Sequence, residues 1–84
     1  MYQVVIERRA EKDMDRLSSP IRRRVSDSIL ALASDPRPVG CRKLVGSSDD
    51  WRIRVGDYRV IYQIADTIRV VRVTRVRYRR EVYK

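Results

Sequence analysis

The sequence predicts an α+β domain in which two N-terminal helices pack on one face of a small, mainly antiparallel four-stranded sheet, in the order β-α-α-β-β-β. Two observations support this prediction. Apolar stripes with helical spacing occupy the first half of the 84-residue chain, and runs with strand alternation dominate the second half. Two helices on one face bury both stripes economically. A chain of this length holds one hydrophobic core, so we expect a single domain over residues 1–84.

The N-terminal half is predicted to hold one strand and two helices. Tyr2–Ile6 is rich in β-branched residues and is predicted to be a strand. A short helix follows, because apolar residues recur at spacings of four and three on one face, at Ala10, Met14 and Leu17. Ser18–Pro20 ends it, and Ser19 before Pro20 is typical of an N-cap followed by the first residue of a second helix. The apolar stripe of that helix stops near Asp35-Pro36 and comprises Ile21, Val25, Ile29, Leu32 and Ala33.

The C-terminal half is predicted to form three strands after a connection at Arg37–Gly40. Apolar residues alternate with arginine over 51–55, and Gly56-Asp57 then turns the chain into a second alternating run over 58–64. Two residues between two alternating runs predict a hairpin. Ala65–Thr67 is a second tight turn, and Ile68–Val73 is apolar enough for a central strand packed on both faces.

Composition narrows the classes of protein and of chemistry. No apolar run approaches the ~20 residues of a membrane span, so we expect a cytoplasmic protein that uses no membrane. The chain has no histidine and one cysteine, Cys41, which excludes an intramolecular disulfide and removes the usual nitrogen ligands of zinc. We therefore expect no metal and no cofactor, and histidine-based acid/base catalysis is excluded.

The chain carries a positive net charge that is concentrated in its C-terminal half. The formal net charge is +9, and residues 43–84 contribute 11 basic against 5 acidic groups. Arg69–Lys84 alone holds seven basic groups and one acid, and 17 of the 20 basic residues are arginine. The guanidinium fork binds phosphate through two hydrogen bonds, so this bias favours a polyanionic partner. Weaker alternatives are an anionic membrane or an acidic protein, and the plain alternative is an arginine-rich genome.

Strand alternation predicts where these arginines meet. If the apolar residues of 51–55 face the helices, Arg52 and Arg54 lie on the opposite, open face. Arg59, just past the hairpin turn, can join them there, and Arg77 and the Arg79-Arg80 pair follow the central strand. Converging guanidinium groups repel one another, which makes sense if an anion fills the space between them. The alternative is an ordinary solvated strand face, where arginine is common.

The hairpin and the C-terminus together resemble a known family. The run Lys43-Leu44, then W-R-I-R-V-G-D-Y-R-V-I-Y over 51–62, then Arg77 and the closing E-V-Y over 81–83 resembles the RelE branch of the RelE/ParE toxin superfamily. The resemblance spans nearly the whole chain, and the hairpin is its most diagnostic piece. It implies a RelE-like fold and a toxin of a type II toxin–antitoxin pair. It also implies a ribosome-dependent endoribonuclease that cleaves mRNA in the A site.

The resemblance also implies roles for individual residues. Arg52 and Arg54 stand where the family often has two lysines, and the set is completed by Arg59, Arg77 and the C-terminal Tyr83. The implied reaction is metal-free attack of the 2'-OH on the adjacent phosphate. Tyr83 is the candidate base, Arg77 the candidate acid, and the other arginines stabilise charge. For Tyr83 the alternative is an aromatic ring packed on the core. Further basic residues are assigned to RNA binding: Lys43, Arg75, Arg79 and Arg80.

Two other functions compete with the nuclease. A ParE-like protein would inhibit DNA gyrase by binding and cut nothing, but that branch usually lacks the basic set together with the closing tyrosine. A plain RNA-binding module would present aromatic residues for base stacking on the open face, whereas Tyr58 and Tyr62 share a phase with the core. As a toxin, the chain is expected to bind mRNA, the ribosome and an acidic antitoxin that forms a hetero-oligomer with it.

Overall fold

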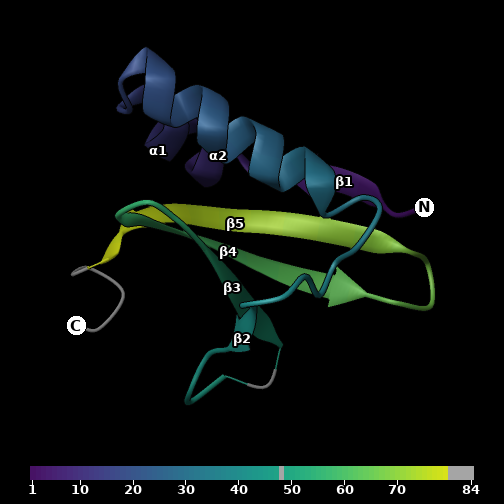
Figure 1. Cartoon of the computed structure of the whole chain (residues 1–84). Helices are drawn as coiled ribbons and strands as arrows, with labels where there is room; N and C mark the ends of the chain where they lie inside the picture. The colour runs from purple at the N-terminus through teal and green to yellow at the C-terminus, as the bar shows by residue number, and fades with distance from the viewer. Residues whose placement is uncertain (48, 80–84) are drawn as a thin grey trace.

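A computed structural model of the chain describes residues 1–47 and 49–79. In chain order its elements are β1 (Gln3–Ile6), α1 (Arg8–Asp15), α2 (Ser19–Ala31), β2 (Arg42–Lys43), β3 (Asp50–Val55), β4 (Tyr58–Ala65) and β5 (Val70–Tyr78). The strands form one sheet in the order β1-β5-β4-β3-β2, and both helices lie on the same face of it (Figure 1). Of the described strand pairs, β1 with β5 is parallel and the others are antiparallel. The predicted α+β class is confirmed, and so is the predicted order of the two helices and the four longer strands.

The sheet has one strand more than the sequence predicted. The extra strand, β2, pairs Arg42 with Arg52 and Lys43 with Trp51 at the edge of the sheet. Two residues are too few to show an alternation, so the pattern that predicts strands elsewhere gives no signal here. The predicted hairpin is confirmed, with Gly56 at φ +60° in the turn between β3 and β4.

The bounds and the burial predicted for the strand Ile68–Val73 are wrong. Strand β5 starts at Val70 and continues to Tyr78, so Arg77 lies inside the strand and does not follow it. Ile68 is 69% exposed in the preceding turn, and Arg72 is exposed, so only one face of β5 is packed. A β-bulge at Thr74, opposite Ile61 and Tyr62, breaks the period of two just after Val73, which explains why the predicted strand ends too early. It does not explain the burial, which was predicted from the adjacent Val70 and Val71. The predicted central position is confirmed, since β5 lies between β1 and β4.

The two helices were predicted with small errors at their ends. Helix α1 begins at Arg8 and ends at Asp15, so Leu17 is buried from the segment that follows it. Helix α2 has Ser18 and not Ser19 as its N-cap, and Pro20 lies in its first turn. The core joins the helix stripes to the sheet through fully buried side chains: Val25, Ile29, Val60, Tyr62, Val71 and Val73. No helix among residues 1–47 and 49–79 is long and apolar enough to cross a membrane.

A buried carboxylate fixes α1 against β5. Asp13 is 8% exposed and accepts hydrogen bonds from Arg75 Nε at 2.8 Å, Arg75 Nη2 at 3.1 Å and the Val76 amide at 2.9 Å. Burial, the largest single influence, raises the pKa of Asp13, but the hydrogen bonds from Arg75 and Val76 together outweigh it and lower the pKa below its ordinary value. The two elements are therefore joined by a charged contact whose polar atoms are satisfied.

Candidate active site on the open face of the sheet

Three arginines form a row straight across three strands. Arg54 of β3 is the register partner of Arg59 of β4, and Arg59 is the register partner of Arg77 of β5. Directly opposed side chains on antiparallel strands lie about 5 Å apart at Cβ, so three cationic groups are neighbours on the face that the helices leave open. This arginine row lies near the β3–β4 turn, at the end of the sheet where β5 ends (Figure 1). The prediction that these side chains share a face is confirmed.

The middle member of the arginine row is buried. Arg59 is only 3% exposed, and its Nη1 donates a hydrogen bond to the carbonyl oxygen of Arg79 at 2.9 Å. The amide of Arg79 in turn donates to the carbonyl of Asp57 in the hairpin turn at 2.8 Å. A solvated strand face would leave Arg59 mobile, whereas these bonds hold its guanidinium in one position. Sequence reasoning missed this positioning role of the Arg79 main chain, which no side-chain pattern reveals.

A second basic row lies one register step further from the turn. Arg52 has Ile61 of β4 on one side and Arg42 of β2 on the other. Arg42, Arg52 and Arg54 also line a cavity of about 560 Å³ that reaches α2 and the connection before β2. Arg42 was not predicted as a site residue, because its place beside Arg52 depends on the short strand β2. The basic surface is therefore wider than the sequence indicated.

Comparison with known proteins decides the family. The family model of the ParE toxin of type II toxin–antitoxin systems, parDE, matches residues 4–83. The chain belongs to this family. None of the curated proteins matches the sequence.

Solved structures place this member of the RelE/ParE superfamily on the RelE side. The chain resembles one in the archaeal RelE–RelB complex from Pyrococcus horikoshii OT3, with 30% identity, a TM-score of 0.81 and coverage of 93% of this chain and 94% of that one. A mutant of the E. coli toxin RelE in the free state gives 30% identity and a TM-score of 0.79, covering 98% and 90%. The RelBE2 toxin–antitoxin complex from Mycobacterium tuberculosis gives 26%, a TM-score of 0.82, and 93% and 98%. The predicted resemblance and the RelE-like fold are confirmed.

Not every predicted site residue of this RelE-like chain joins the row. Lys43 lies on the other side of β2 from Arg42, with Nζ 5.7 Å from the centre of the Trp51 ring. Arg75 turns to Asp13, and the side chain of Arg79 is exposed beside the row. The remaining predicted site residues, Arg80 and Tyr83, lie outside the described residues. Within 1–47 and 49–79, no three side chains of the metal-ligating types gather into a group.

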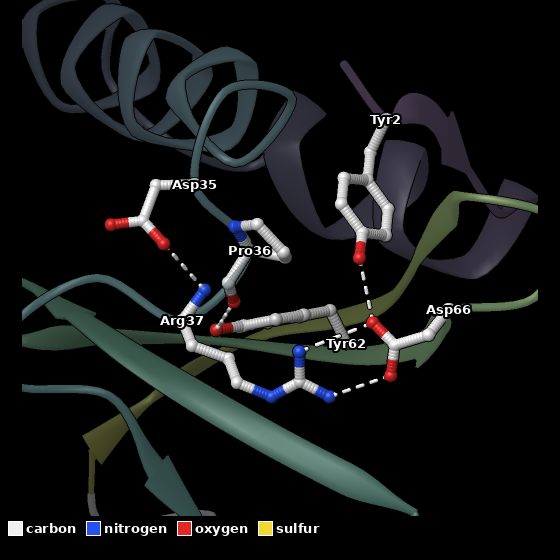
Figure 2. Close-up of polar contacts among 6 residues, drawn as sticks. All are labelled: Tyr2, Asp35, Pro36, Arg37, Tyr62 and Asp66. Atoms are coloured by element: carbon white, nitrogen blue, oxygen red, sulfur yellow. Dashed lines mark hydrogen bonds and ion pairs between the residues drawn. The ribbon is translucent and has the colours of Figure 1, made fainter.

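A separate polar network holds the opposite end of the sheet. Asp66, in the β4–β5 turn, accepts hydrogen bonds from the Tyr2 hydroxyl at 2.6 Å and from Arg37 Nη1 and Nη2 at 3.2 and 2.9 Å (Figure 2). The hydrogen bonds from Arg37 and Tyr2 lower the pKa of Asp66 to about 2. Beside it, the buried Tyr62 hydroxyl donates to the Pro36 carbonyl at 2.7 Å. The network joins the N-terminus, the connection after α2 and the turn, and its groups satisfy one another.

The arginine row can do one chemical task well. Guanidinium groups stay protonated at any physiological pH, so they are poor bases but strong, fixed hydrogen-bond donors to phosphate oxygens. A buried, oriented guanidinium stabilises developing negative charge better than a mobile one, because it does not have to reorganise when the charge appears. The open face is therefore suited to binding a phosphodiester and to stabilising extra charge on it.

Proposed function

We propose that this chain is the toxin of a type II toxin–antitoxin pair and acts as a ribosome-dependent endoribonuclease that cleaves mRNA in the A site. The observation that supports it most is the arginine row, in which the buried Arg59 lies between Arg54 and Arg77. Like charges directly opposite one another destabilise a sheet. A fold that nevertheless keeps them together, with the central one held by a backbone carbonyl, is suited to an anionic ligand.

The reaction that suits these residues needs no metal. The 2'-OH attacks the adjacent phosphate, the P–O5' bond breaks, and the products are a 2',3'-cyclic phosphate and a 5'-hydroxyl. One proton leaves the 2'-OH and one is delivered to the 5'-oxygen. Arg52, Arg54 and Arg59 bind the phosphate and stabilise the dianionic phosphorane that forms between these steps. The exposed Arg79 adds basic charge beside the arginine row, and Lys43 adds basic charge at the edge of the sheet, on the other side of β2 from Arg42.

We assign the proton transfers to Tyr83 and Arg77. Tyr83 removes the 2'-OH proton, since the chain has no histidine and arginine stands at both positions where relatives often have lysine. A phenol ordinarily has a pKa near 10, and a guanidinium group brought close to a phenol favours its ionised form. Arg77, at the end of the arginine row, donates to the leaving 5'-oxygen.

The proposed partner is an acidic antitoxin. Similar chains have been solved in complexes named RelE–RelB from Pyrococcus horikoshii and RelBE2 from Mycobacterium tuberculosis. A chain with net charge +9 attracts an acidic protein, and a segment that is disordered until bound can wrap a small domain. With mRNA and the ribosome as the other partners, we expect the toxin to act in the cytoplasm.

Primer extension on mRNA from translating ribosomes tests the activity. Purified protein is expected to produce discrete cuts inside codons, and naked RNA is expected to be cut poorly. The ribosome can hold the 2'-OH in line with the P–O5' bond, and such positioning contributes on the order of 7 to 11 kcal/mol. Rapid metal-free cleavage of naked RNA would contradict the dependence on the ribosome. An absence of cuts on ribosomes would overturn the proposed activity.

Tyr83→Phe tests the mechanism, because it removes only the hydroxyl. If Tyr83 is the base, single-turnover cleavage falls by about 100- to 10,000-fold while ribosome binding and thermal stability stay nearly unchanged. The wild-type rate is expected to rise with pH as the phenol ionises, and this rise should be missing in the variant. Cleavage by Tyr83→Phe at close to the wild-type rate would return the role of base to another group.

A second candidate function follows from the family model that matches. That model is described as the ParE toxin of parDE systems. The function expected above for a ParE-like protein, inhibition of DNA gyrase by binding without cutting, is therefore the second candidate. A supercoiling assay with purified gyrase separates the two functions. Inhibition of gyrase without cuts on ribosomes would favour this second function over the nuclease.

A further inference from the structure

The two-residue turn between β3 and β4 lies in the chain between two members of the arginine row, Arg54 and Arg59. Gly56, its first residue, has φ +60°, and Asp57 does not have a positive φ. This is the pattern of a II′ turn, which takes glycine at its first position because other residues rarely adopt positive φ. A Cβ on Gly56 would lie 3.6 Å from Arg24 Nη1 of α2, an ordinary van der Waals distance. The backbone conformation, and not crowding, therefore favours glycine here.

The main chain of this turn holds the first residue after β5. The Arg79 amide donates to the Asp57 carbonyl at 2.8 Å, one step beyond the last register pair of β4 and β5, which is Tyr58 with Tyr78. The rings of these two tyrosines meet edge to face with their centroids 5.6 Å apart, a favourable arrangement that keeps the two strand ends together just before that bond. The position of the Arg79 backbone therefore depends on the conformation of the turn.

The Arg79 backbone in turn holds the centre of the arginine row, because its carbonyl oxygen accepts a hydrogen bond from Nη1 of the buried Arg59 at 2.9 Å. A carbonyl fixes the direction of a guanidinium without cancelling its charge. A carboxylate partner, such as the Asp13 that pairs with Arg75, also neutralises the charge. A group that stabilises developing charge on a phosphate has to be oriented and still positive, which only the first kind of partner allows. The turn, the Arg79 main chain and Arg59 thus form a relay of main-chain contacts, called the turn relay below.

We infer that Gly56 is a positioning residue for the proposed cleavage and sets the direction of the Arg59 guanidinium through the turn relay. The inference rests on the proposed nuclease function, and it adds that the rate depends on a turn that carries no side chain of the site. A displacement of about 1 Å in a group that stabilises the transition state can cost about 100-fold in rate. Substitutions at Gly56 should act on kcat more than on KM, because Arg52 and Arg54 still bind the RNA.

Substitutions of Gly56 test the turn relay at its origin. Valine strongly disfavours positive φ, whereas asparagine adopts it more readily than most residues. Single-turnover cleavage at saturating ribosomes is expected to fall by about 10- to 100-fold in Gly56→Val, with the half-saturating ribosome concentration changed by less than about threefold. Gly56→Asn should cleave within about threefold of the wild-type rate. The matched control is Gly46→Val, at φ +85° in the β2–β3 connection with open space around it, which should leave cleavage per folded molecule unchanged.

Substitutions of Arg79 test the turn relay at its second bond. Arg79→Pro removes the amide that donates to Asp57 and keeps the carbonyl that accepts from Arg59. The preceding residue, Tyr78, lies in β5 and already has the extended backbone that proline requires before it. Arg79→Ala removes the same side chain but keeps the amide, so the difference between the two variants reports the bond. We expect Arg79→Pro to cleave about tenfold more slowly than Arg79→Ala.

Nitrogen NMR of the arginine side chains measures the hold on Arg59 without relying on cleavage. A guanidinium held by a hydrogen bond rotates slowly about its Cζ–Nη bonds and gives separate Nη1 and Nη2 signals, whereas a mobile one gives an averaged signal. Separate Arg59 signals are expected in the wild type, Gly56→Asn and Gly46→Val, and an averaged signal in Gly56→Val and Arg79→Pro. If Gly56→Val does not fold, the comparison of Arg79→Pro with Arg79→Ala decides by the same signals.

The two measurements separate the turn relay from the proposed function. Separate Arg59 signals that persist in Gly56→Val and Arg79→Pro would overturn the turn relay. An averaged signal with unchanged cleavage per folded molecule would overturn the positioning role of Gly56 and leave the nuclease intact. Wild-type protein that makes no cuts on ribosomes, while these variants lose the separate signals, would keep the hold on Arg59 and overturn the nuclease.

Discussion

The two faces of the sheet differ in how their buried charges are arranged: one face pairs opposite charges and the other places like charges side by side. On the helix side, Asp13 is buried between α1 and β5 with its hydrogen bonds supplied by Arg75 and the Val76 amide. On the open side, the buried Arg59 lies between two further arginines in register. A buried ion pair with satisfied partners holds elements together, whereas a row of like charges across a sheet costs stability. The difference is what the proposed function requires, with the helix side holding the fold together and the open side binding an anionic ligand.

Removing the buried carboxylate on the helix side should have the largest effect on stability. Asp13→Ala leaves the Val76 amide and the Arg75 guanidinium without their carboxylate, and loss of one partner of a buried pair typically costs about 3–5 kcal/mol. We expect the free energy of unfolding in urea to fall by that order. A matched control is Asp15→Ala, which removes an exposed carboxylate from the same helix. Equal losses in both variants would show that the contact does not hold α1 on β5.

The pH dependence of stability follows from the same contact. The pKa of Asp13 is lower in the folded chain than in the unfolded chain, so its contribution is fully present above the unfolded value of about 3.9 and is lost as the pH falls through the folded value. Acid titration of the unfolding free energy should therefore show a loss below pH ~4 that is smaller in Asp13→Asn. A variant that loses stability in acid as the wild type does would assign the loss to other carboxylates.

Removing an arginine from the row on the open face should change activity more than stability. Arg59→Ala is expected to reduce the rate of cleavage on ribosomes by about 100- to 1,000-fold, the usual cost of losing one preorganised charge stabiliser. Removing one cation from the arginine row relieves repulsion, so the thermal midpoint should stay close to that of the wild type or rise. Arg23→Ala, on an exposed position of α2, controls for the loss of one positive charge.

One result for Arg59→Ala would contradict the role of Arg59 in the active site. If Arg59→Ala unfolds the domain while activity per folded molecule is unchanged, its bond to the Arg79 carbonyl is structural and the arginine row is not the active site. Arg59→Lys adds a second measurement, because it keeps the charge and loses the planar fork. An intermediate rate in this variant would assign part of the effect to charge alone.

A smaller effect is expected at the buried hydroxyl of Tyr62. Tyr62→Phe leaves the Pro36 carbonyl without its donor and should lower the free energy of unfolding by about 1–2 kcal/mol, because an unsatisfied buried polar group costs about 1–3 kcal/mol. Cleavage per folded molecule should not change, since Tyr62 faces the helices. A loss of activity at full stability would place this residue in the site and not in the core. Tyr2→Phe, whose hydroxyl is exposed, should cost less.

The sequence predicts the two faces better than it predicts the details of either. Strand alternation alone places Arg54 and Arg59 together, because a period of two allows no other arrangement once the apolar residues face the helices. It fails at Thr74 and Arg75, where a bulge lets Val73 and Val76 both face the core at a spacing of three.

The rest of the site depends on contacts that no pattern carries. The basic residue Arg42 lies beside Arg52 only because the two-residue strand β2 pairs with β3. The Arg79 carbonyl that holds Arg59 is a main-chain group, so the side chain of residue 79 says nothing about it. Helical spacing places Asp13 beside Ala10 and Leu17 on the apolar face, but its partners lie 62 and 63 positions away. Such contacts follow from the fold and can be predicted only after it is known.

The smallest effect is predicted for a substitution in the β4–β5 turn, at the end of the sheet away from the arginine row. Arg69 has φ +53°, and Arg69→Gly removes the cost that a Cβ carries in this region, so we expect the free energy of unfolding to rise by up to about 1 kcal/mol. Arg69→Ala keeps the Cβ and should show no gain. If the hydrogen bonds to Asp66 fix the turn, Arg69→Gly should also leave the rate of cleavage on ribosomes unchanged. A more stable variant with slower cleavage would show instead that the side chain of Arg69 contributes to RNA binding on the open face.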